Sequence, residues 1–392
     1  MSENLDPVLS EWGPGGFDPV MGGLVALQQA LASPDPQVRI RALKDALHHG
    51  EEGAQLLIKS LHEDKDWQVK FTAWELLLKS DNPQHVQVAK AYRFPLRQVG
   101  DVQAKYRAGE RDFRWADLSG ASLWGEVNLS NTDLRGANLS KADLSGANLS
   151  GADLGGAKLN RANLSEADLS GASLSRANLS RANLSRANLN EADLRGADLR
   201  GADLGRANLN RANLSKADLS GANLRGSFVS ETTQLDPKWR LVWEIVNSQA
   251  GLKNLSGADL SGANLSGSNL SRASLGEANL YGTDLRDANL IGADLSRADL
   301  QEANLAGAYL IGANLRGANL TGANLSRARL IGADLDEANL SRANLSGADL
   351  SWAKLWGTQL RGANLAGARL NLGWGWFKDL TDTILPDGTR HP

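Results

Sequence analysis

The chain has 392 residues, no cysteine, and 45 acidic against 42 basic residues, which leaves a net charge of −3. The lack of cysteine excludes disulfides, thiolate metal sites and a cysteine nucleophile. The nearly balanced charge excludes a strong global field that would draw the chain to nucleic acid or to an acidic membrane. We find neither a secretion signal nor a run of about 18 apolar residues, so we expect a cytoplasmic protein without membrane contact.

The first part of the chain, residues 1–111, has the apolar spacing of α-helices. Apolar residues recur with that spacing in four segments: 22–33, 36–50, 51–63 and 67–80. Four residues of the second segment return 31 positions later: Val38, Arg39, Ala42 and Leu47 as Val69, Lys70, Ala73 and Leu78. This period resembles short HEAT-like helical repeats, and residues 91–110 follow as a last helix or a linker. We therefore predict a small α-helical, HEAT-like domain over residues 1–111.

The next pattern is a leucine at every fifth position. Leu118 and Leu123 are followed by one extra residue, and the period then runs unbroken over Leu129–Leu224. A second array repeats it over Leu255–Leu370, so the two arrays hold 46 in-phase leucines. Alanine usually stands two residues before each leucine and Asp or Asn one residue before it, while Ser, Arg, Gly or Glu follow. A period of five fits neither an α-helix nor a flat strand.

A chain that turns a corner after each five-residue unit explains this pattern. Four corners close a coil of about 20 residues, and stacked coils can pair their backbones at the strand spacing of about 4.8 Å. Leucine then fills the interior, and alanine is small because it lies beside the leucine layer near a corner. Asp and Asn suit the turns because their side chains can bond local backbone amides, and Gly tolerates unusual dihedral angles.

Tandem A(D/N)LXX units of this kind resemble the pentapeptide-repeat proteins. The resemblance implies an all-β solenoid, a right-handed quadrilateral β-helix, over residues 112–235 and again over 255–370. Neither array contains histidine, so no nucleophile, base and acid can be assembled within them. The histidines elsewhere lack metal-ligand spacing. We therefore expect no enzymatic activity, no cofactor and no metal site.

A segment without the five-residue period separates the arrays, and we predict a helical insertion over residues 236–254. Apolar residues lie at helical spacing within it: Trp239, Val242, Trp243 and Val246. The helix is expected to begin just after Pro237. It can cover the open end of a coil stack, or its tryptophans Trp239 and Trp243 can contact a partner. Because the arrays are about one coil apart, we expect them to stack nearly coaxially.

The C-terminal segment, residues 371–392, is predicted to cap the second array, because an open coil end exposes unpaired backbone groups. Its aromatic residues, Trp374, Trp376 and Phe377, could cover that end or form a dimer seam. Some pentapeptide-repeat proteins dimerise through their C-terminal ends, so the resemblance implies a monomer or such a dimer. Three further tryptophans occupy outward positions near array ends, where they pack on a cap or contact a ligand or partner: Trp124, Trp352 and Trp356.

Stacked coils of 20 residues would also align charged side chains. Lys141, Arg161 and Arg181 would form a short basic ladder that either contacts an anionic partner or is a solvated face. Glu277 and Arg297 would form an ion pair. Residues 116–226 hold 12 acidic and 13 basic residues, and residues 255–370 hold 11 and 10, so both arrays are close to neutral.

These observations favour a non-enzymatic scaffold that binds a protein partner, with the helical domain supplying recognition. Two alternatives follow from the resemblance. Some family members inhibit DNA gyrase by mimicking DNA, which requires a strongly negative rod, and neither array provides one. An accessory role in pigment attachment or complex assembly has no supporting residue in this chain. We do not expect nucleic acid to be a partner.

Overall fold

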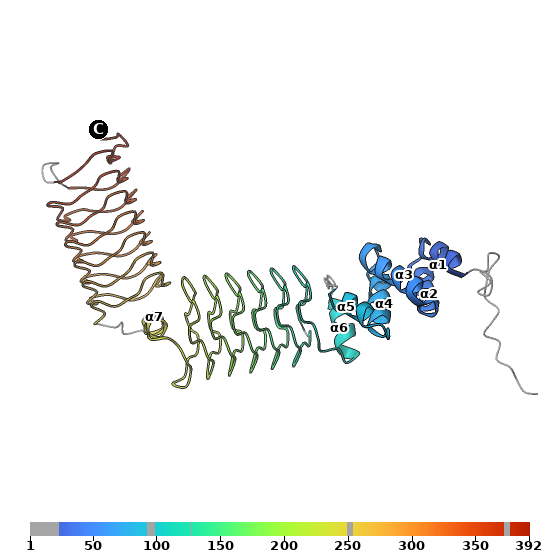
Figure 1. The fold of residues 1–392 in the computed structure, drawn as a ribbon. Coiled ribbons are helices and arrows are strands. Elements are labelled where there is room, and N and C mark those ends of the chain that lie inside the picture. Colours follow the sequence, from blue (N-terminus) through green and yellow to red (C-terminus); the bar gives the residue numbers. More distant parts are fainter. Residues whose placement is uncertain (1–22, 92–98, 126, 249–253, 372–376) are drawn as a thin grey trace, which may run out of the picture. The chain divides into compact units, whose positions relative to one another are not determined.

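The computed structural model describes residues 23–91, 99–125, 127–248, 254–371 and 377–392. Contacts divide the chain into two compact units, Met1–Phe94 and Pro95–Pro392. The first unit is helical and the second is built mainly from stacked coils (Figure 1). The predicted fold class, a quadrilateral β-helix preceded by α-helices, is therefore confirmed. No helix in the described segments is long and apolar enough to cross a membrane.

In its described part the first unit consists of five α-helices and one 3₁₀ turn. They are α1 (Gly23–Leu31), α2 (Pro36–Ala46), η1 (Leu47–His49), α3 (Gly50–Glu63), α4 (Trp67–Leu78) and α5 (Pro83–Ala91). The four segments with helical spacing correspond to α1–α4, whereas the periodicity did not predict α5. The core consists of leucines, alanines and a valine that the helical spacing places on the inner side of the helices, and its leucines include Leu43, Leu57, Leu61 and Leu77, all fully buried.

An ion pair links α2 to the segment between α3 and α4. Arg39 of α2 donates through Nε to Asp64 Oδ2 at 2.9 Å and through Nη2 to Asp64 Oδ1 at 3.1 Å. Asp64 stands between α3 and α4, and its Oδ1 also accepts the Asp66 N–H at 2.8 Å. Both charged side chains are nearly buried, and the two-bond geometry is the strong form of such a pair.

The second unit begins with α6 (Val99–Arg107). Val102 is fully buried, and Tyr106 Oη lies 3.0 Å from Ser130 Oγ in the first coils. This helix therefore packs against the start of the first array. The predicted boundary at residue 111 marks where the five-residue period begins, whereas the contacts place the boundary before Pro95, because α6 packs with the coils.

One unit of the first array illustrates how the sequence produces a corner. Leu184 is fully buried, and its N–H donates to Asp203 O in the next coil at 2.7 Å. The chain then turns, because Ala187 N–H donates back to Leu184 O at 3.0 Å while Arg186 takes a φ of 59°. Ala187 follows into the interior and is also fully buried. The predicted inward leucine and alanine are thereby confirmed.

Successive coils are offset by 20 residues, as in the parallel bridge Asn163↔Asn183. The offset is 21 in the first coil, for example between Asp117 and Asn138. That coil contains the extra residue noted in the sequence between its second and third leucines. The insertion therefore lengthens one coil and leaves the inward leucines in phase.

The Asp and Asn residues that precede the leucines stabilise both the turn and the stack. Asn183 Oδ1 accepts the Ser185 N–H at 3.1 Å, which fixes the local turn. Asn183 Nδ2 donates to Asn163 Oδ1 in the neighbouring coil, also at 3.1 Å. The predicted bonding of these side chains to local backbone amides is confirmed.

The helix between the arrays, α7 (Pro237–Asn247), covers the last coil of the first array. Trp243 Nε1 donates to Ser227 O at 3.0 Å, and Asn247 Nδ2 donates to Leu224 O at 3.1 Å. Gly226 N–H also donates to Asn247 Oδ1, at 2.6 Å. In a regular coil the groups equivalent to Ser227 O and Gly226 N–H pair with the next coil, as Ala202 O and Gly201 N–H do. The helix α7 therefore satisfies groups that another coil would otherwise pair. The buried side chains of α7 are Trp239, Val242 and Ile245.

The hydrogen-bonded ladder does not run from one array into the other. Among the described residues, the bridges of the first array end at Gln234, those of the second begin at Asn254, and none joins the two. A backbone bond from Gly221 N–H to Gly262 O, at 2.7 Å, does connect them. Coaxial stacking through a continuous ladder is therefore not observed, because α7 pairs with the end of the first array.

The C-terminal segment, predicted as a cap over residues 371–392, includes a further partial coil. Ile384 forms a parallel bridge with Asn364 of the preceding coil and an antiparallel bridge with Arg390. The second array thus extends beyond its last in-phase leucine before the chain folds back on itself. Two of the predicted cap aromatics, Trp374 and Trp376, lie outside the described residues.

Candidate functional site

Candidate sites lie on the outside of the arrays, because leucine and alanine fill the inside. In the segments that the structure describes, no three His, Asp or Glu side chains gather where they could hold a metal ion. Each five-residue unit presents three outward positions, which are the residue before leucine and the two residues after it. The identities of these residues, read from coil to coil, define the surfaces below.

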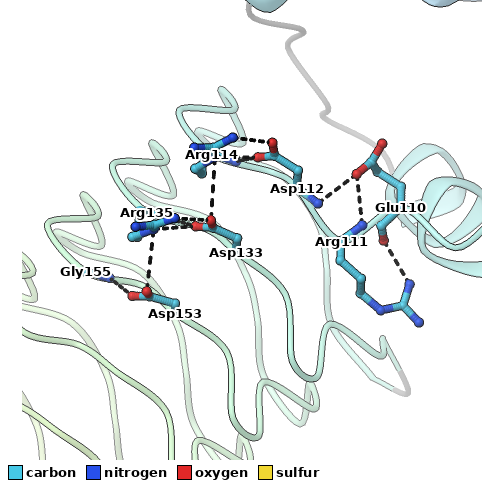
Figure 2. Close-up of polar contacts among 8 residues, drawn as sticks. All are labelled: Glu110, Arg111, Asp112, Arg114, Asp133, Arg135, Asp153 and Gly155. Carbon is cyan, nitrogen blue, oxygen red and sulfur yellow. Dashed lines mark hydrogen bonds and ion pairs between the residues drawn. The ribbon is translucent and has the colours of Figure 1, made fainter.

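Five residues at the start of the first array form a chain of ion pairs that we call the Asp–Arg zipper: Asp112, Arg114, Asp133, Arg135 and Asp153 (Figure 2). Arg114 pairs with Asp112 at 2.7 Å and approaches Asp133 at 3.5 Å. Arg135 repeats this one coil later, with a 2.9 Å bond to Asp133 Oδ1 and a 3.5 Å contact with Asp153. Each arginine bridges two coils, so the zipper contributes to holding the coils together. Both of its arginines are paired with carboxylates, which leaves neither free to bind an anionic partner.

The zipper also changes the acidity of its carboxyl groups. The hydrogen bond from Arg114 lowers the pKa of Asp112 below its usual value, and the hydrogen bond from Arg135 lowers the pKa of Asp133 in the same way. Ionised Asp is the form that these arginines stabilise. Both carboxyl groups therefore stay charged to a lower pH than an isolated Asp.

The predicted basic ladder is present. Lys141 N–H donates to Asn160 O and Arg161 N–H donates to Ser180 O, so Lys141, Arg161 and Arg181 hold equivalent corner positions in consecutive coils. Their side chains are exposed. The three stacked cations that the sequence predicted therefore face solvent together.

The coil register adds two cations that the sequence analysis missed. Lys158 forms bridges with Asn138 in the coil before it and Asn178 in the coil after it, on the side of the stack that ends at the ladder corner. Arg176 stands at the opposite corner, where this side begins. We call the full set the basic face: Lys141, Lys158, Arg161, Arg176 and Arg181. Its three rungs, residues 136–141, 156–161 and 176–181, contain these five cations and no acid. Writing the sequence in rows of 20 would have revealed it.

A groove of about 670 Å³ lies beside the basic face and shares Arg176 with it. Glycines at the corners of neighbouring coils, Gly155, Gly156 and Gly196, leave space between larger side chains. The groove is also lined by Arg135, Arg195 and Lys216, with Asp153 as its one acidic lining residue. Its other lining residues are glycine and serine, and Arg195 is paired with Asp193 at 2.6 Å. Arg176 and Lys216 are therefore the lining cations without an ion pair among the described residues.

A different surface occupies one corner of the second array, which we call the isoleucine ladder: Ile291, Ile311 and Ile331. Gly292 N–H donates to Ile311 O and Gly312 N–H donates to Ile331 O, so the three isoleucines stack in consecutive coils. Ile291 is 40% exposed and the other two are half-buried. The sequence analysis missed this ladder, although the spacing of 20 residues was its signal.

Two further apolar side chains lie close to this ladder in the coil register. Tyr309 stands two residues before Ile311 and is 39% exposed, with the Arg329 guanidinium 5.7 Å from its ring centre. Trp352, one of the predicted partner contacts, occupies the same corner as Gly332, one coil further on. The register is shown by Gly332 N–H, which donates to the carbonyl of Ser351, the residue before Trp352. The structure thus groups Trp352 with the isoleucine ladder.

The remaining predicted tryptophans fall into two groups. Trp239 is only 7% exposed and Trp243 is half-buried with its indole N–H bonded to α7's neighbouring coil, so their burial supports the covering role rather than partner contact. By contrast, the exposed fractions of Trp124, Trp352 and Trp356 are 63%, 74% and 55%. Packing on a cap, one of the two roles considered for these three, does not agree with that exposure.

The predicted pair of Glu277 and Arg297 is present in the second array. Arg297 Nη1 lies 3.8 Å from Glu277 Oε1, and both side chains are largely exposed. At that distance and exposure the pair contributes little to folding. Its value is that it confirms the register of 20 residues in this array.

The chain belongs to the pentapeptide-repeat family. The family described as Pentapeptide repeats matches it in eight copies, which together cover residues 126–226 and 254–371, more than half of the 392 residues. The matched segments are the two arrays described above.

Three solved structures of this type are similar to the chain. HetL, a pentapeptide repeat protein involved in heterocyst differentiation regulation in Nostoc sp. strain PCC 7120, is 32% identical over 75% of this chain and 99% of HetL, with a TM-score of 0.29. Rfr23 from Cyanothece 51142 is 27% identical over 35% of this chain and 99% of Rfr23, with a TM-score of 0.20. QnrB1, a plasmid-mediated fluoroquinolone resistance protein, is 19% identical over 63% of this chain and 92% of QnrB1, with a TM-score of 0.22. No curated protein matches the chain.

Proposed function

We propose that this protein is a non-enzymatic scaffold whose coil stack supports binding surfaces for other proteins. The observation that carries the proposal is the isoleucine ladder. Isoleucine gains free energy when it leaves water, yet these three side chains stand at an outward position that the fold does not need to bury. In the first array the same position holds no aliphatic residue. A ladder of aliphatic side chains that remain partly exposed is typical of a protein-binding surface.

The shape of this surface fits an extended segment of a partner protein. The ladder is one side chain wide, and with Trp352 it spans four coils, about 15 Å at the strand spacing. A stable dimer buries about 800 Å² per subunit, which is more than so narrow a strip offers to a second copy. A segment that runs along the stack can place alternate apolar side chains against successive coils.

The test compares proteins captured by three forms of the full chain. The first is unchanged, the second carries Ile291→Asn, Ile311→Asn and Ile331→Asn, and the control carries Gln301→Asn, Thr321→Asn and Ser341→Asn, which stack at another corner of the same array. Partners that bind the ladder are lost from the second form and retained by the control, as measured by quantitative mass spectrometry. Size-exclusion chromatography with light scattering on the same samples distinguishes a partner from a second copy. Equal capture by all three forms would contradict the proposal.

The helical unit is a second possible source of recognition. A chain that lacks residues 1–94, compared with the full chain in the same experiment, separates its contribution from that of the ladder. Loss of every partner on this deletion, with none lost in the isoleucine variant, would assign recognition to the helices.

The charge distribution does not favour the gyrase-inhibitor alternative. DNA mimicry requires a strongly negative rod, whereas each array is within one charge of neutrality. We therefore expect no inhibition of DNA gyrase in a supercoiling assay at micromolar protein. The regulatory role of HetL, by comparison, agrees with a protein that acts by binding.

A further inference from the structure

The basic face of the first array carries charge that the fold leaves unneutralised. Within the described residues none of its five cations forms an ion pair. Other arginines at equivalent corners of the same array do form them: Arg186 with Glu166 at 3.0 Å and Arg211 with Glu191 at 2.8 Å. Opposite charges can thus be placed one coil apart in this fold, and the basic face lacks them.

Four of these cations also occupy a backbone conformation that L side chains rarely adopt. The φ angles of Lys141, Arg161, Arg176 and Arg181 are 61°, 60°, 57° and 58°. Glycine adopts this region without steric cost, and Gly201 does so in the coil that follows Arg181. The fold therefore accepts glycine at this corner, and the cations at the preceding coils are not required for the turn.

The basic face ends abruptly at both sides. Asp117 lies in the coil before it, and Asp198 and Asp218 lie in the two coils after it, in the same column of bridges. Arg200 pairs with both of these later acids, at 2.7 and 3.8 Å. The unpaired positive charge of the basic face therefore spans three coils, about 10 Å along the stack. Arg206 and Lys216, which also form no ion pair among the described residues, lie outside its rungs. A nucleic acid contacts a protein through a long run of phosphates, which would extend past this patch and meet carboxylates.

The border of the basic face offers contacts for uncharged groups. Trp115 is 54% exposed at the same corner as Arg176, and its indole lies over Gly136. Arg176 also lines the groove formed by the corner glycines. Tryptophan and arginine are the residues that most often dominate protein interfaces, and a groove beside them can admit one side chain.

We propose that the basic face binds a short acidic segment of a partner protein. Its carboxylates bind Arg161, Arg176 and Arg181, and an apolar side chain of the segment packs against Trp115. This surface is on the other array from the isoleucine ladder, so either proposal can fail alone.

The probe for this proposal is a fluorescein-labelled hexaglutamate peptide, with hexaglutamine as its uncharged match. Fluorescence anisotropy with the full chain at low salt is expected to give saturable binding of hexaglutamate, with a dissociation constant below about 1 mM, and none of hexaglutamine. The variant with Arg161→Gln, Arg176→Gln and Arg181→Gln is expected to bind about tenfold more weakly, since each exposed ion pair contributes a modest amount.

The matched control removes the same charge from other corners of the same array through Arg186→Gln, Arg206→Gln and Arg211→Gln. It is expected to retain binding within about twofold, and the variant with Arg161→Lys, Arg176→Lys and Arg181→Lys is expected to retain most of it. Equal weakening in the two Gln variants would overturn the proposal, because net charge alone would then explain binding. So would absence of binding by the unchanged chain, or tighter binding of a 20-nucleotide single strand of DNA than of hexaglutamate. Thermal melting verifies that each variant is folded.

Discussion

The two arrays have the same interior and different exteriors. In both, the inward leucines and alanines are buried except at array ends, where Ala116, Ala258 and Leu370 are half-buried, and the backbone bonds repeat mainly with an offset of 20 residues. The outward positions of the first array carry the Asp–Arg zipper and the basic face, whereas those of the second carry the isoleucine ladder. Two of every five positions thus set the fold, and the other three are free to differ. Function should therefore depend on outward residues and stability on inward ones.

The largest expected effect tests whether the interiors are equivalent. Leu184 and Leu315 are both fully buried at the centre of their arrays. Leu184→Asp should lower the free energy of unfolding by about 4 kcal/mol or more, because it buries an unpaired carboxylate. Leu315→Asp should cost a similar amount for the same reason. Chemical denaturation followed by circular dichroism measures both.

A clear difference between these two variants would break the comparison, since it would mean that the arrays differ in packing as well as in surface. The outward substitution Arg206→Asp is the control for the first array. It should change stability by less than about 0.5 kcal/mol, because the Arg206 side chain is exposed and forms no ion pair among the described residues.

The inward residues were predictable because the sequence repeats them without interruption. A leucine at every fifth position can be buried only if the chain turns after each unit, and that requirement fixes both the coil and its length. The helix α7 was predictable too, because Pro237 marks its start and its apolar residues follow helical spacing. In each case one physical requirement, burial of apolar surface, acts on residues that are close together in the sequence.

The second prediction concerns α7, the helix that covers the end of the first array. The described part of the second array has no such helix. Trp239→Ala should cost about 3 kcal/mol, because it removes a large buried side chain from between α7 and the coils. Glu244→Ala, on the exposed side of the same helix, should be nearly neutral. Thermal unfolding with separate fluorescence and circular dichroism readouts would measure both. If Trp239→Ala were also neutral, α7 would be a loosely attached element and not a cap.

The outward groups were harder to predict because they depend on register between distant residues. Lys158 joins the basic face only because the coil length places it beside Asn138 and Asn178. The helix α6 was assigned to the helical domain because its sequence has helical character, yet it packs with the coils. The sequence could not predict whether Trp239 is buried against the coils or exposed to a partner. An amphipathic helix is suited to either role.

A third and smaller difference lies in two serines that replace alanine at inward positions. Ser227 Oγ, in the first array, donates to Leu224 O at 2.8 Å. Ser268 Oγ, in the second array, is buried and has no hydrogen-bond partner among the described residues. Ser268→Ala should therefore raise the free energy of unfolding by up to about 1 kcal/mol, whereas Ser227→Ala should lower it by about 1 kcal/mol. Effects of the same sign in urea denaturation would show that burial of the hydroxyl, and not its bonding, decides the outcome.

The smallest expected effect is the change in stability with pH that the Asp–Arg zipper gives to the first array. The hydrogen bond from Arg135 holds the pKa of Asp133 below its ordinary value of 3.8. A carboxyl group with a lowered pKa in the folded protein stabilises it fully above the ordinary pKa, and this contribution is lost as the pH falls through the lowered value.

Asp133→Asn should therefore lower the melting temperature by about 1 °C at pH 7, because exposed ion pairs contribute little. The difference from the unchanged chain should shrink towards zero as the pH falls below 3.8. The control Asn364→Ala removes an uncharged side chain from the same position of a unit in the second array, where its Oδ1 accepts the Ala366 N–H at 3.0 Å. Because that side chain carries no titratable group, the effect of this control should not change with pH. A constant Asp133→Asn effect from pH 7 to pH 2 would mean that the side chain acts through its turn hydrogen bond alone, and that the zipper adds nothing to the stability of the first array.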